Sequence, residues 1–340
     1  MSFSSAADAP APAIANIVEV ENCRDVLRVF SDGSIHRTTG PSFPVPVEDD
    51  GSIEWDDATF ALDLGLRLRL YRPRHRLPTD PGKLPIFYYF HGGGYCIGSR
   101  TWPNFHNYCL RLAAGLRSVI VSPDYRLAPE NRLPAALDDS LASILWIRSQ
   151  ALSGDPNPLL SDADFSRVYI SGDSAGGSIA HHLAVRFSSD EGRSELEPLL
   201  VRGYVLLMPF FGGTQRSKSE EYCPSDAFLN LELNDRFWRL SLPVGSTTDD
   251  PVSNPFGPGG PDLKAVRFDP MLVVVGGRDL LRDRAADYGE RLKEWGKPVE
   301  VLDFEGQQHG FFTIQPRSEP ADRLMSYIRR FMDKNGCRLD

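Results

Sequence analysis

Three residues of the types that together hydrolyse esters stand at separate points of this sequence, in the order Ser174, Asp279, His309. A serine hydroxyl is a weak nucleophile until an imidazole takes its proton, and the imidazole needs a carboxylate that fixes its tautomer and stabilises its charged form. In one class of parallel sheet these groups follow successive strands in this same order. The sequence therefore predicts a catalytic triad at these three positions.

Ser174 is at the centre of residues 172–176 (GDSAG), which read as a sharp turn between a strand and a helix. The run 168–170 (VYI) before it is apolar, and the residues after it take helical spacing through Ile179 and Leu183. Glycines on both sides of the serine remove the Cβ atoms that would clash in so tight a turn. We expect the turn to hold the hydroxyl clear of the backbone. The alternative is a glycine-rich turn that serves only close packing.

Asp279 and His309 each come just after an apolar strand, at 271–275 and 299–304. The carboxyl ends of parallel strands meet at one edge of a sheet, so these residues can join one site. Asp283 is the alternative acid, but it falls one turn into the next predicted helix and resembles a helix-start residue. The other histidines, which fit packing, bracing or surface positions, are His36, His75, His91, His106, His181 and His182.

Residues 91–94 (HGGG) follow an uninterrupted apolar run at 85–90, of the kind that is buried on both faces of a sheet. Consecutive glycines leave backbone NH groups unshielded, and such groups can stabilise the negative oxygen of a tetrahedral intermediate. The NH of Ala175, directly after the serine, is the expected second donor. The alternative interpretation of the glycines is a flexible loop.

The alternation of strands and helices predicts an α/β fold with a mostly parallel central sheet and helices on both faces. The expected strands are 85–90, 118–121, 168–170, 201–208, 271–275 and 299–304, and the expected helices are 105–116, 134–149, 283–294, 319–332 and one after Ser174. On the amino-terminal side we expect outer antiparallel strands, namely a hairpin over 25–37 and a half-buried strand over 64–71.

Residues 212–262 depart from this alternation, with charged turns, an aromatic helical piece and a Pro/Gly-rich exit. We expect this insertion to form a helical cap with residues 1–50, over a core made of residues 51–211 and 263–340. The candidate substrate-contacting side chains are aromatic: Tyr95, Phe210, Phe237 and Trp238. The last two can equally be packing residues, which is the usual role of an aromatic stripe.

The first residues suggest two different states. Residues 1–13 are rich in Ala, Ser and Pro and are expected to be disordered. Residues 14–24 are expected to form an amphipathic helix that lies across the body of the protein.

Composition excludes several classes of function. The net charge of −9 argues against a nucleic-acid surface, and the one basic cluster, residues 67–76, is interpreted as a solvated strand edge. No run approaches the roughly 18 apolar residues of a membrane span, and no signal or transit peptide is readable. The five cysteines are scattered without a C-x-x-C pair, which fits a reduced compartment and no structural zinc. We expect a cytoplasmic or nucleocytoplasmic protein with no metal, cofactor, nucleic-acid or membrane partner. Its oligomeric state is not readable.

Four motifs resemble the hormone-sensitive-lipase-like branch of α/β-hydrolases, and more closely the plant carboxylesterases, a group that also contains gibberellin receptors. They are residues 91–94 (HGGG), 124–130 (DYRLAPE), 172–177 (GDSAGG) and 309–311 (HGF). The resemblance covers about residues 20–335. It implies an α/β-hydrolase fold, the triad Ser174, Asp279 and His309, and a cap made from the N-terminus and the inserted segment. It also implies an oxyanion hole formed by the NH groups of Gly93, Gly94 and Ala175.

A finer resemblance is to plant carboxylesterases that hydrolyse strigolactones. It rests on residues 99–113 (SRTWPNFHNYCLRLA), 201–213 (VRGYVLLMPFFGG) and 235–245 (DRFWRLSLPVG). At 248–251 (TDDP) relatives commonly carry an Arg-Asp-His-Pro-like run, and this departure concerns cap-loop contacts rather than the triad.

The sequence is compatible with functions of different classes. The first is a serine carboxylesterase that hydrolyses a small-molecule ester or lactone through an acyl-enzyme, with a strigolactone as the expected substrate. The alternative is a non-catalytic small-hormone receptor whose N-terminal segment closes over its ligand. Gibberellin receptors keep the serine motif but lack the catalytic histidine, and the presence of His309 therefore favours the esterase. A lyase or cyclase on the same scaffold is a third interpretation.

Overall fold

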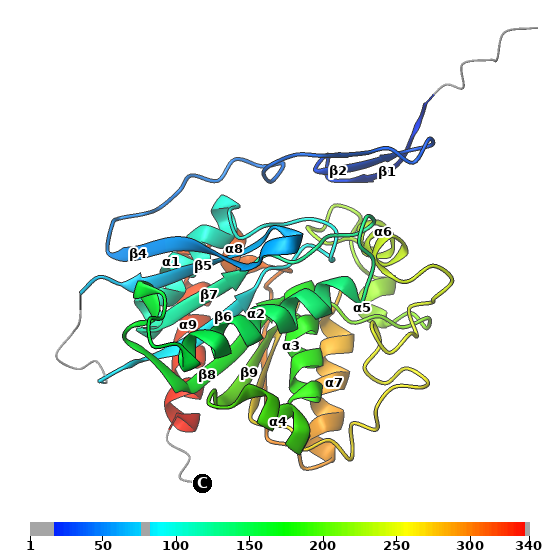
Figure 1. The fold of residues 1–340 in the computed structure, drawn as a ribbon. Coiled ribbons are helices and arrows are strands. Elements are labelled where there is room, and N and C mark those ends of the chain that lie inside the picture. The colour runs from blue at the N-terminus through cyan, green and yellow to red at the C-terminus, as the bar shows by residue number, and fades with distance from the viewer. Residues whose placement is uncertain (1–16, 76–81, 337–340) are drawn as a thin grey trace, which may run out of the picture.

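The computed structural model describes residues 17–75 and 82–336, which contain a twisted eight-stranded sheet (Figure 1). Its strands are β4 (Ile53–Ala61), β5 (Leu66–Pro73), β6 (Leu84–Phe90), β7 (Val119–Pro123), β8 (Ala163–Asp173), β9 (Val201–Leu207), β10 (Met271–Gly276) and β11 (Val299–Phe304). They lie in the order β11-β10-β9-β8-β6-β7-β5-β4. All pairs from β11 to β7 are parallel, and β5 is antiparallel to both of its neighbours. The predicted α/β fold with a mostly parallel sheet is confirmed.

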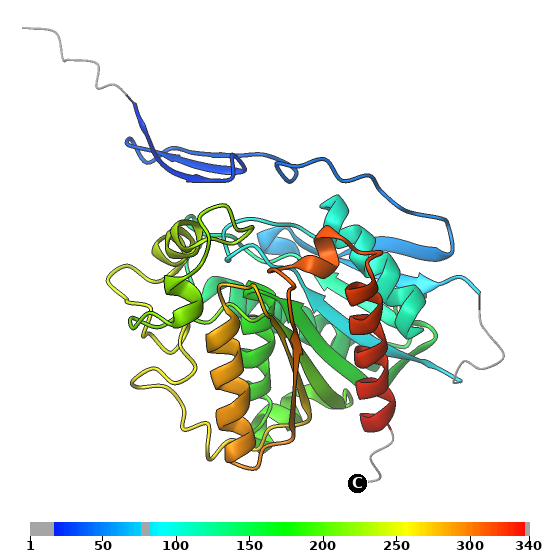
Figure 2. The same ribbon diagram turned by 180° about the vertical axis from the view of Figure 1, so that it is seen from behind.

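Helices cover both faces of the sheet. On one face lie α2 (Ala135–Leu152), α3 (Ala175–Arg186) and α7 (Arg282–Glu294), and on the other lie α1 (Pro103–Leu116) and α9 (Glu319–Asn335) (Figures 1 and 2). Short helices α4 (Asp190–Leu196) and α8 (Phe311–Ile314) and the 3-10 turns η1 (Leu62–Leu64) and η2 (Pro158–Leu160) complete this body. Every residue of β6 and β10 is buried, which explains their uninterrupted apolar sequences.

The first strands form a separate small sheet in the order β1 (Glu19–Cys23), β2 (Leu27–Phe30) and β3 (Ile35–Arg37). The β2–β3 hairpin confirms the prediction for residues 25–37. The helix predicted over residues 14–24 is wrong where the structure describes it, because β1 pairs antiparallel with β2.

A turn without a recognisable sequence signature causes this difference. Arg24 and Asp25 both have positive φ, 56° and 57°, and reverse the chain between β1 and β2. The Asn22 side chain holds the turn, because its Oδ1 accepts from the Asp25 NH at 2.7 Å and its Nδ2 donates to Asp25 Oδ1 at 2.8 Å. Valines at 18 and 20 also favour an extended strand over a helix.

The outer part of the main sheet differs from the prediction in two ways. The edge strand β4 was not expected. The basic cluster at residues 67–76 is not simply a solvated edge, because Arg69 is only 8% exposed and its Nε donates to Asp57 Oδ1 of β4 at 2.7 Å. The Arg69 guanidinium also lies over the Trp55 ring, 4.2 Å from its centroid. Pairing with Asp57 and Trp55 is what permits this burial.

Residues 212–262 contain α5 (Lys218–Glu221) and α6 (Leu231–Ser241), joined by irregular chain. Helix α6 lies beside the small amino-terminal sheet, above one end of the main sheet (Figure 1). No helix in the described ranges is long and apolar enough to cross a membrane. Residues 1–13, predicted to be disordered, and Cys337 lie outside the described residues, and the four described cysteines are free thiols.

Candidate active site

Ser174 stands at the tip of the turn between β8 and α3, in a backbone conformation that L-residues avoid. Its φ is 54° and its ψ is −119°. A Cβ on Gly172 would lie 2.3 Å from the Gly176 carbonyl carbon, and one on Gly176 would lie 1.9 Å from the Phe90 oxygen. Both neighbours must therefore be glycine, as the motif indicates. The strain at Ser174 is of the kind that functional sites retain when the surrounding structure enforces it.

Asp279 and His309 meet at the same edge of the sheet. Asp279 follows β10 and His309 follows its parallel neighbour β11, and His309 Nδ1 lies 2.8 Å from Asp279 Oδ2. Both side chains are buried. The other carboxylate oxygen of Asp279, Oδ1, accepts from the Leu281 NH at 3.0 Å. The pair is thus fixed in orientation, and one nitrogen of the imidazole is left to face the cavity.

The electrostatics favour a protonated intermediate at His309. Burial by itself would lower the pKa of His309, but the charge and hydrogen bond of Asp279 outweigh it and raise the pKa above its usual value. The negative charge of Asp173 acts in the same direction, and the positive charge of Arg24 opposes it. A histidine tuned in this way accepts a proton from a serine hydroxyl more readily than a free imidazole does.

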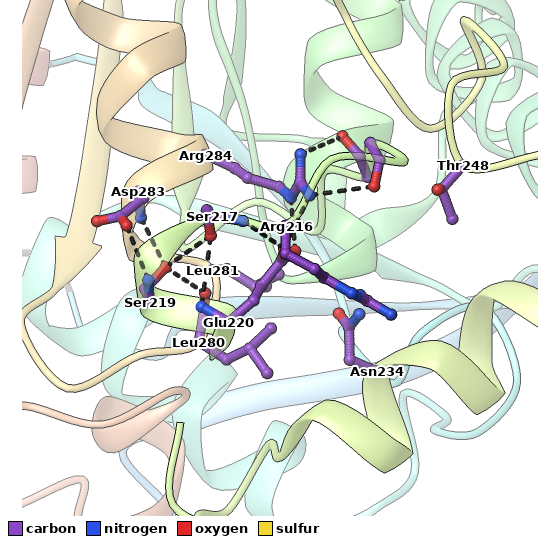
Figure 3. A network of polar contacts seen from close by, with 12 residues as sticks. Arg216, Ser217, Ser219, Glu220, Asn234, Thr248, Leu280, Leu281, Asp283 and Arg284 are labelled. Carbon is purple, nitrogen blue, oxygen red and sulfur yellow. Dashed lines mark hydrogen bonds and ion pairs between the residues drawn. The ribbon is translucent and has the colours of Figure 1, made fainter. Parts of the chain in front are cut away.

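Asp283, the alternative acid, binds elsewhere. Its Oδ2 accepts from the backbone NH of Ser219 at 2.8 Å, and the Ser219 hydroxyl donates to the Leu280 carbonyl at 2.7 Å (Figure 3). Beside it, Arg284 of α7 binds the buried Glu220 carboxylate at 2.6 and 2.9 Å and the Gly212 carbonyl at 3.0 Å. This network ties the inserted segment to the turn that carries Asp279.

The glycine run forms a tight loop next to Ser174. Gly93 and Gly94 have φ of 116° and 58° and line the same cavity as Ser174 and His309. The Gly93 carbonyl accepts from the NH groups of residues 96 and 97 at 3.0 Å, which makes the loop a defined turn. Ala175 is the first residue of α3, where backbone NH groups have no partner within the helix. Two of the expected oxyanion donors, Gly93 and Gly94, thus line the cavity, and the third, Ala175, directly follows the Ser174 that lines it.

The base of this loop is braced by aromatic packing. The His91 ring stacks on Tyr125, with ring centroids 4.4 Å apart, and the Tyr125 hydroxyl donates to the His91 carbonyl at 2.8 Å. This is the bracing role considered for His91 from the sequence. His181 and His182 are turned to other partners, the Tyr288 hydroxyl and the Val252 carbonyl.

Asp173 is a buried, titratable neighbour of the triad that was not among the site residues predicted from the sequence. It is buried, lines the cavity, and accepts a hydrogen bond from the Tyr89 hydroxyl at 2.6 Å. Burial raises its pKa to about 6, although the Tyr89 hydrogen bond and the charge of His309 favour its ionised form. Its position inside the GDSAG motif was the available signal.

The cavity in front of Ser174 has mostly apolar walls. Its large apolar side chains come from the core and from both additional segments: Phe43, Trp102, Phe105, Phe228, Leu233 and Phe237. Pockets lined by apolar and aromatic side chains with a few polar groups commonly bind small organic ligands. The contributions of Phe43 and Phe228 were missed because they lie in irregular chain with no periodic pattern.

Of the four aromatic residues expected to contact substrate, Phe237 lines this cavity. A Cβ on Gly94 would lie 2.3 Å from Phe237 Cγ, so the loop and α6 approach as closely as glycine allows. Tyr95, Phe210 and Trp238 are buried and are not among the cavity-lining residues. Phe210 and Trp238 stack with centroids 3.9 Å apart, in a packed layer behind the wall.

Ion pairs hold the amino-terminal sheet over the cavity. Glu21 of β1 accepts from Arg236 Nε at 3.0 Å and from Arg239 Nε at 2.6 Å, both on α6. On the other side, Arg37 of β3 donates to the Glu130 carboxylate at 2.7 Å through Nε and also binds the carbonyl of Cys96. The sheet is thereby fastened to both the inserted segment and the glycine loop.

Comparison with known proteins places the chain among esterases and their relatives. A family model described as the alpha/beta hydrolase fold matches residues 87–313. Tuliposide A-converting enzyme 2, chloroplastic, of Tulipa gesneriana is 36% identical over 331 residues, covering 95% of this chain and 81% of that protein. Probable carboxylesterase 6 of Arabidopsis thaliana is 34% identical, over 78% of this chain and 76% of that one.

The gibberellin receptor of Oryza sativa subsp. japonica is 32% identical, over 90% of this chain and 89% of the receptor. Among solved structures, an esterase of Pyrobaculum calidifontis superposes with a TM-score of 0.68 at 28% identity, covering 86% of this chain and 87% of the esterase. Sequence and structure therefore point to the same group of proteins.

Proposed function

The chain belongs to the α/β-hydrolase family and is a carboxylic ester hydrolase, and from this premise we propose that Ser174, Asp279 and His309 hydrolyse its ester through an acyl-enzyme. The observation that carries the proposal is the 2.8 Å contact between His309 and Asp279 at the sheet edge where the strained Ser174 lines the same cavity. The relatives' carboxylesterase and esterase names support the same chemistry.

In this mechanism His309 takes the proton of Ser174 as the hydroxyl oxygen attacks the carbonyl carbon. The carbonyl oxygen becomes negative and accepts hydrogen bonds from the NH groups of Gly93, Gly94 and Ala175. His309 then gives its proton to the leaving oxygen as the bond to the acyl carbon breaks. A water molecule, deprotonated by His309, attacks the acyl-enzyme and restores the serine. Asp279 stabilises the imidazolium in both halves.

We further propose a strigolactone as the substrate. Its support is the resemblance of residues 99–113, 201–213 and 235–245 to strigolactone-hydrolysing carboxylesterases. The apolar and aromatic walls of the cavity also suit a fused-ring lactone. Ser174 would attack the butenolide ring carbonyl and break the acyl–oxygen bond of the ring. The freed oxygen would become an aldehyde oxygen as its carbon loses the enol-ether oxygen of the tricyclic fragment, which would leave with the proton from His309.

The test is incubation of the purified protein with a strigolactone and, separately, with p-nitrophenyl acetate. We expect both to be hydrolysed, with a ring-derived adduct on Ser174 detected by mass spectrometry of the quenched reaction. Hydrolysis of p-nitrophenyl acetate alone would overturn the strigolactone proposal and leave the esterase standing. Hydrolysis without any adduct on Ser174 would overturn the acyl-enzyme.

A further inference from the structure

Arg24 is a cation that lines a mostly apolar cavity. It sits at the β1–β2 turn, is half-buried, and lines the same cavity as Ser174 and His309. Its guanidinium lies over the Phe228 ring, with Cζ 4.1 Å from the ring centroid. Its position is therefore fixed by packing on Phe228 and by the strained turn rather than by an acid.

Among residues 17–75 and 82–336, Arg24 has no carboxylate partner, and this sets it apart from its neighbours. Arg28 and Arg37 of the same segment pair with Glu19 and Glu130. A guanidinium has five N–H donors and cannot be deprotonated under physiological conditions. These donors are partly buried and have no carboxylate partner among the described residues, so they are suited to an oxygen acceptor on a ligand.

The positive charge of Arg24 interacts with the catalytic histidine. It acts to lower the pKa of His309, against the stronger effect of Asp279, so the two side chains face the same space. Arg24 is thus near the catalytic histidine without forming part of the triad.

We propose that Arg24 binds a second oxygen of the substrate, distinct from the ester carbonyl that Ser174 attacks, and so selects neutral esters or lactones that carry a second carbonyl group. The proposal rests on the proposed function of Ser174. A neutral acceptor is favoured over a carboxylate because the protein carries a net charge of −9 and Asp173 lines the same cavity. A lactone carbonyl on the released fragment of a strigolactone belongs to this class.

The test compares two p-nitrophenyl esters of equal chain length, the hexanoate and the 5-oxohexanoate, which differ by one ketone oxygen. We expect the wild-type protein to prefer the ketone ester in kcat/KM. In Arg24→Met, which keeps the length and loses the donors, this preference should fall by about 10- to 100-fold, mainly through KM. Arg28→Met is the matched control, since Arg28 belongs to the same sheet and does not line the cavity, and it should keep the preference.

A further variant separates recognition from general damage. Arg24→Lys keeps the charge but not the planar fork, and should keep part of the preference. Loss of rate on both esters in equal proportion in Arg24→Met would overturn the subsite, as would an unchanged preference. Thermal unfolding of each variant distinguishes a local effect from loss of the fold.

A third ester of the same length, ending in a carboxylate, tests the ligand class. If Arg24→Met costs this ester more than it costs the ketone ester, the neutral class is wrong and the site selects anions. All three esters report on Arg24 even if strigolactones prove not to be substrates, so the two failures are distinguishable. If wild-type protein cleaves none of the esters while remaining folded, it is the esterase proposal that fails.

Discussion

Two sides of the cavity are held in place by different interactions: the side that carries the triad, or floor, and the side formed by the segments that cover it, or roof. The floor, with Ser174, Asp279 and His309, stands on the ends of hydrogen-bonded parallel strands, of which β10 is buried at every residue. The roof, made of the amino-terminal sheet and α6, is fastened by side-chain ion pairs such as Glu21 to Arg236 and Arg239. Strand ends in a packed sheet cannot shift independently, whereas partly exposed ion pairs are weak and sensitive to salt. The catalytic residues are therefore held rigidly, whereas the segments that cover the substrate cavity can change position.

The sharpest test of the floor is Ser174→Ala. We expect kcat for p-nitrophenyl acetate to fall by at least about 10³-fold, with thermal stability retained, because the nucleophile is removed and nothing is overpacked. Ser171→Ala is a suitable control, because the Ser171 hydroxyl is buried in β8 without a hydrogen-bond partner among the described residues. Comparable rates in the two variants would show that the floor does not carry the reaction.

The two acids near α7 offer the next largest contrast. Asp279→Asn should lower kcat/KM by about 10²- to 10⁴-fold, because the amide cannot hold the same histidine tautomer or stabilise the imidazolium. Asp283→Asn should cost less than about tenfold, since its carboxylate binds the Ser219 NH that anchors the inserted segment and the neighbouring Arg282 rather than His309. Steady-state rates on p-nitrophenyl acetate give both values. Equal losses would contradict the assignment of the acid.

The roof should respond to Glu21→Gln with a smaller effect. The charge that binds Arg236 and Arg239 is lost, and we expect KM for a cavity-filling ester to rise about threefold to tenfold with little change in kcat. Raising the salt concentration should move the wild-type protein in the same direction. Glu19→Gln, which affects a pair with Arg28 inside the small sheet, is the control. A fall in kcat alone would indicate that the roof also positions the floor.

The smallest expected effect is on the pH profile. His309 must be neutral to act as a base, so kcat/KM should rise with pH through its pKa, which Asp279 raises above 6.5. The negative charge of Asp173 adds to that rise, so Asp173→Asn should move the acid limb to lower pH by about a few tenths of a unit. A shift to higher pH would show that Asp173 does not act on His309 as an anion.

The floor could be predicted from the sequence because each of its parts has a local signature. The turn at Ser174 requires glycines, because a Cβ at either position would clash with backbone atoms. The acid and the base each follow an apolar strand. Strand-end placement also separated Asp279 from Asp283. These features depend on neighbours in the chain or on the general rule that parallel strands end together.

The roof could not be predicted to the same extent, because its contacts join residues about 200 positions apart. Nothing near Glu21 indicates that it binds Arg236, and the turn at Arg24 and Asp25 lacks the glycine or asparagine that would have marked a hairpin. The same turn explains why a helix was expected where β1 lies. Tyr95, Phe210 and Trp238 had the right composition for a pocket wall, but the closed packing of the three rings placed them behind it.

At Ser174 the positive φ lowers the stability of the fold, while the side chain is needed for activity. Glycine would adopt this conformation without a Cβ penalty, so Ser174→Gly should raise the free energy of unfolding by about 1 kcal/mol while removing the hydroxyl. A chain selected only for stability would abandon the serine at this position. The nucleophile is thus kept at a standing thermodynamic cost, and a screen for stabilising substitutions would be expected to recover inactive protein first.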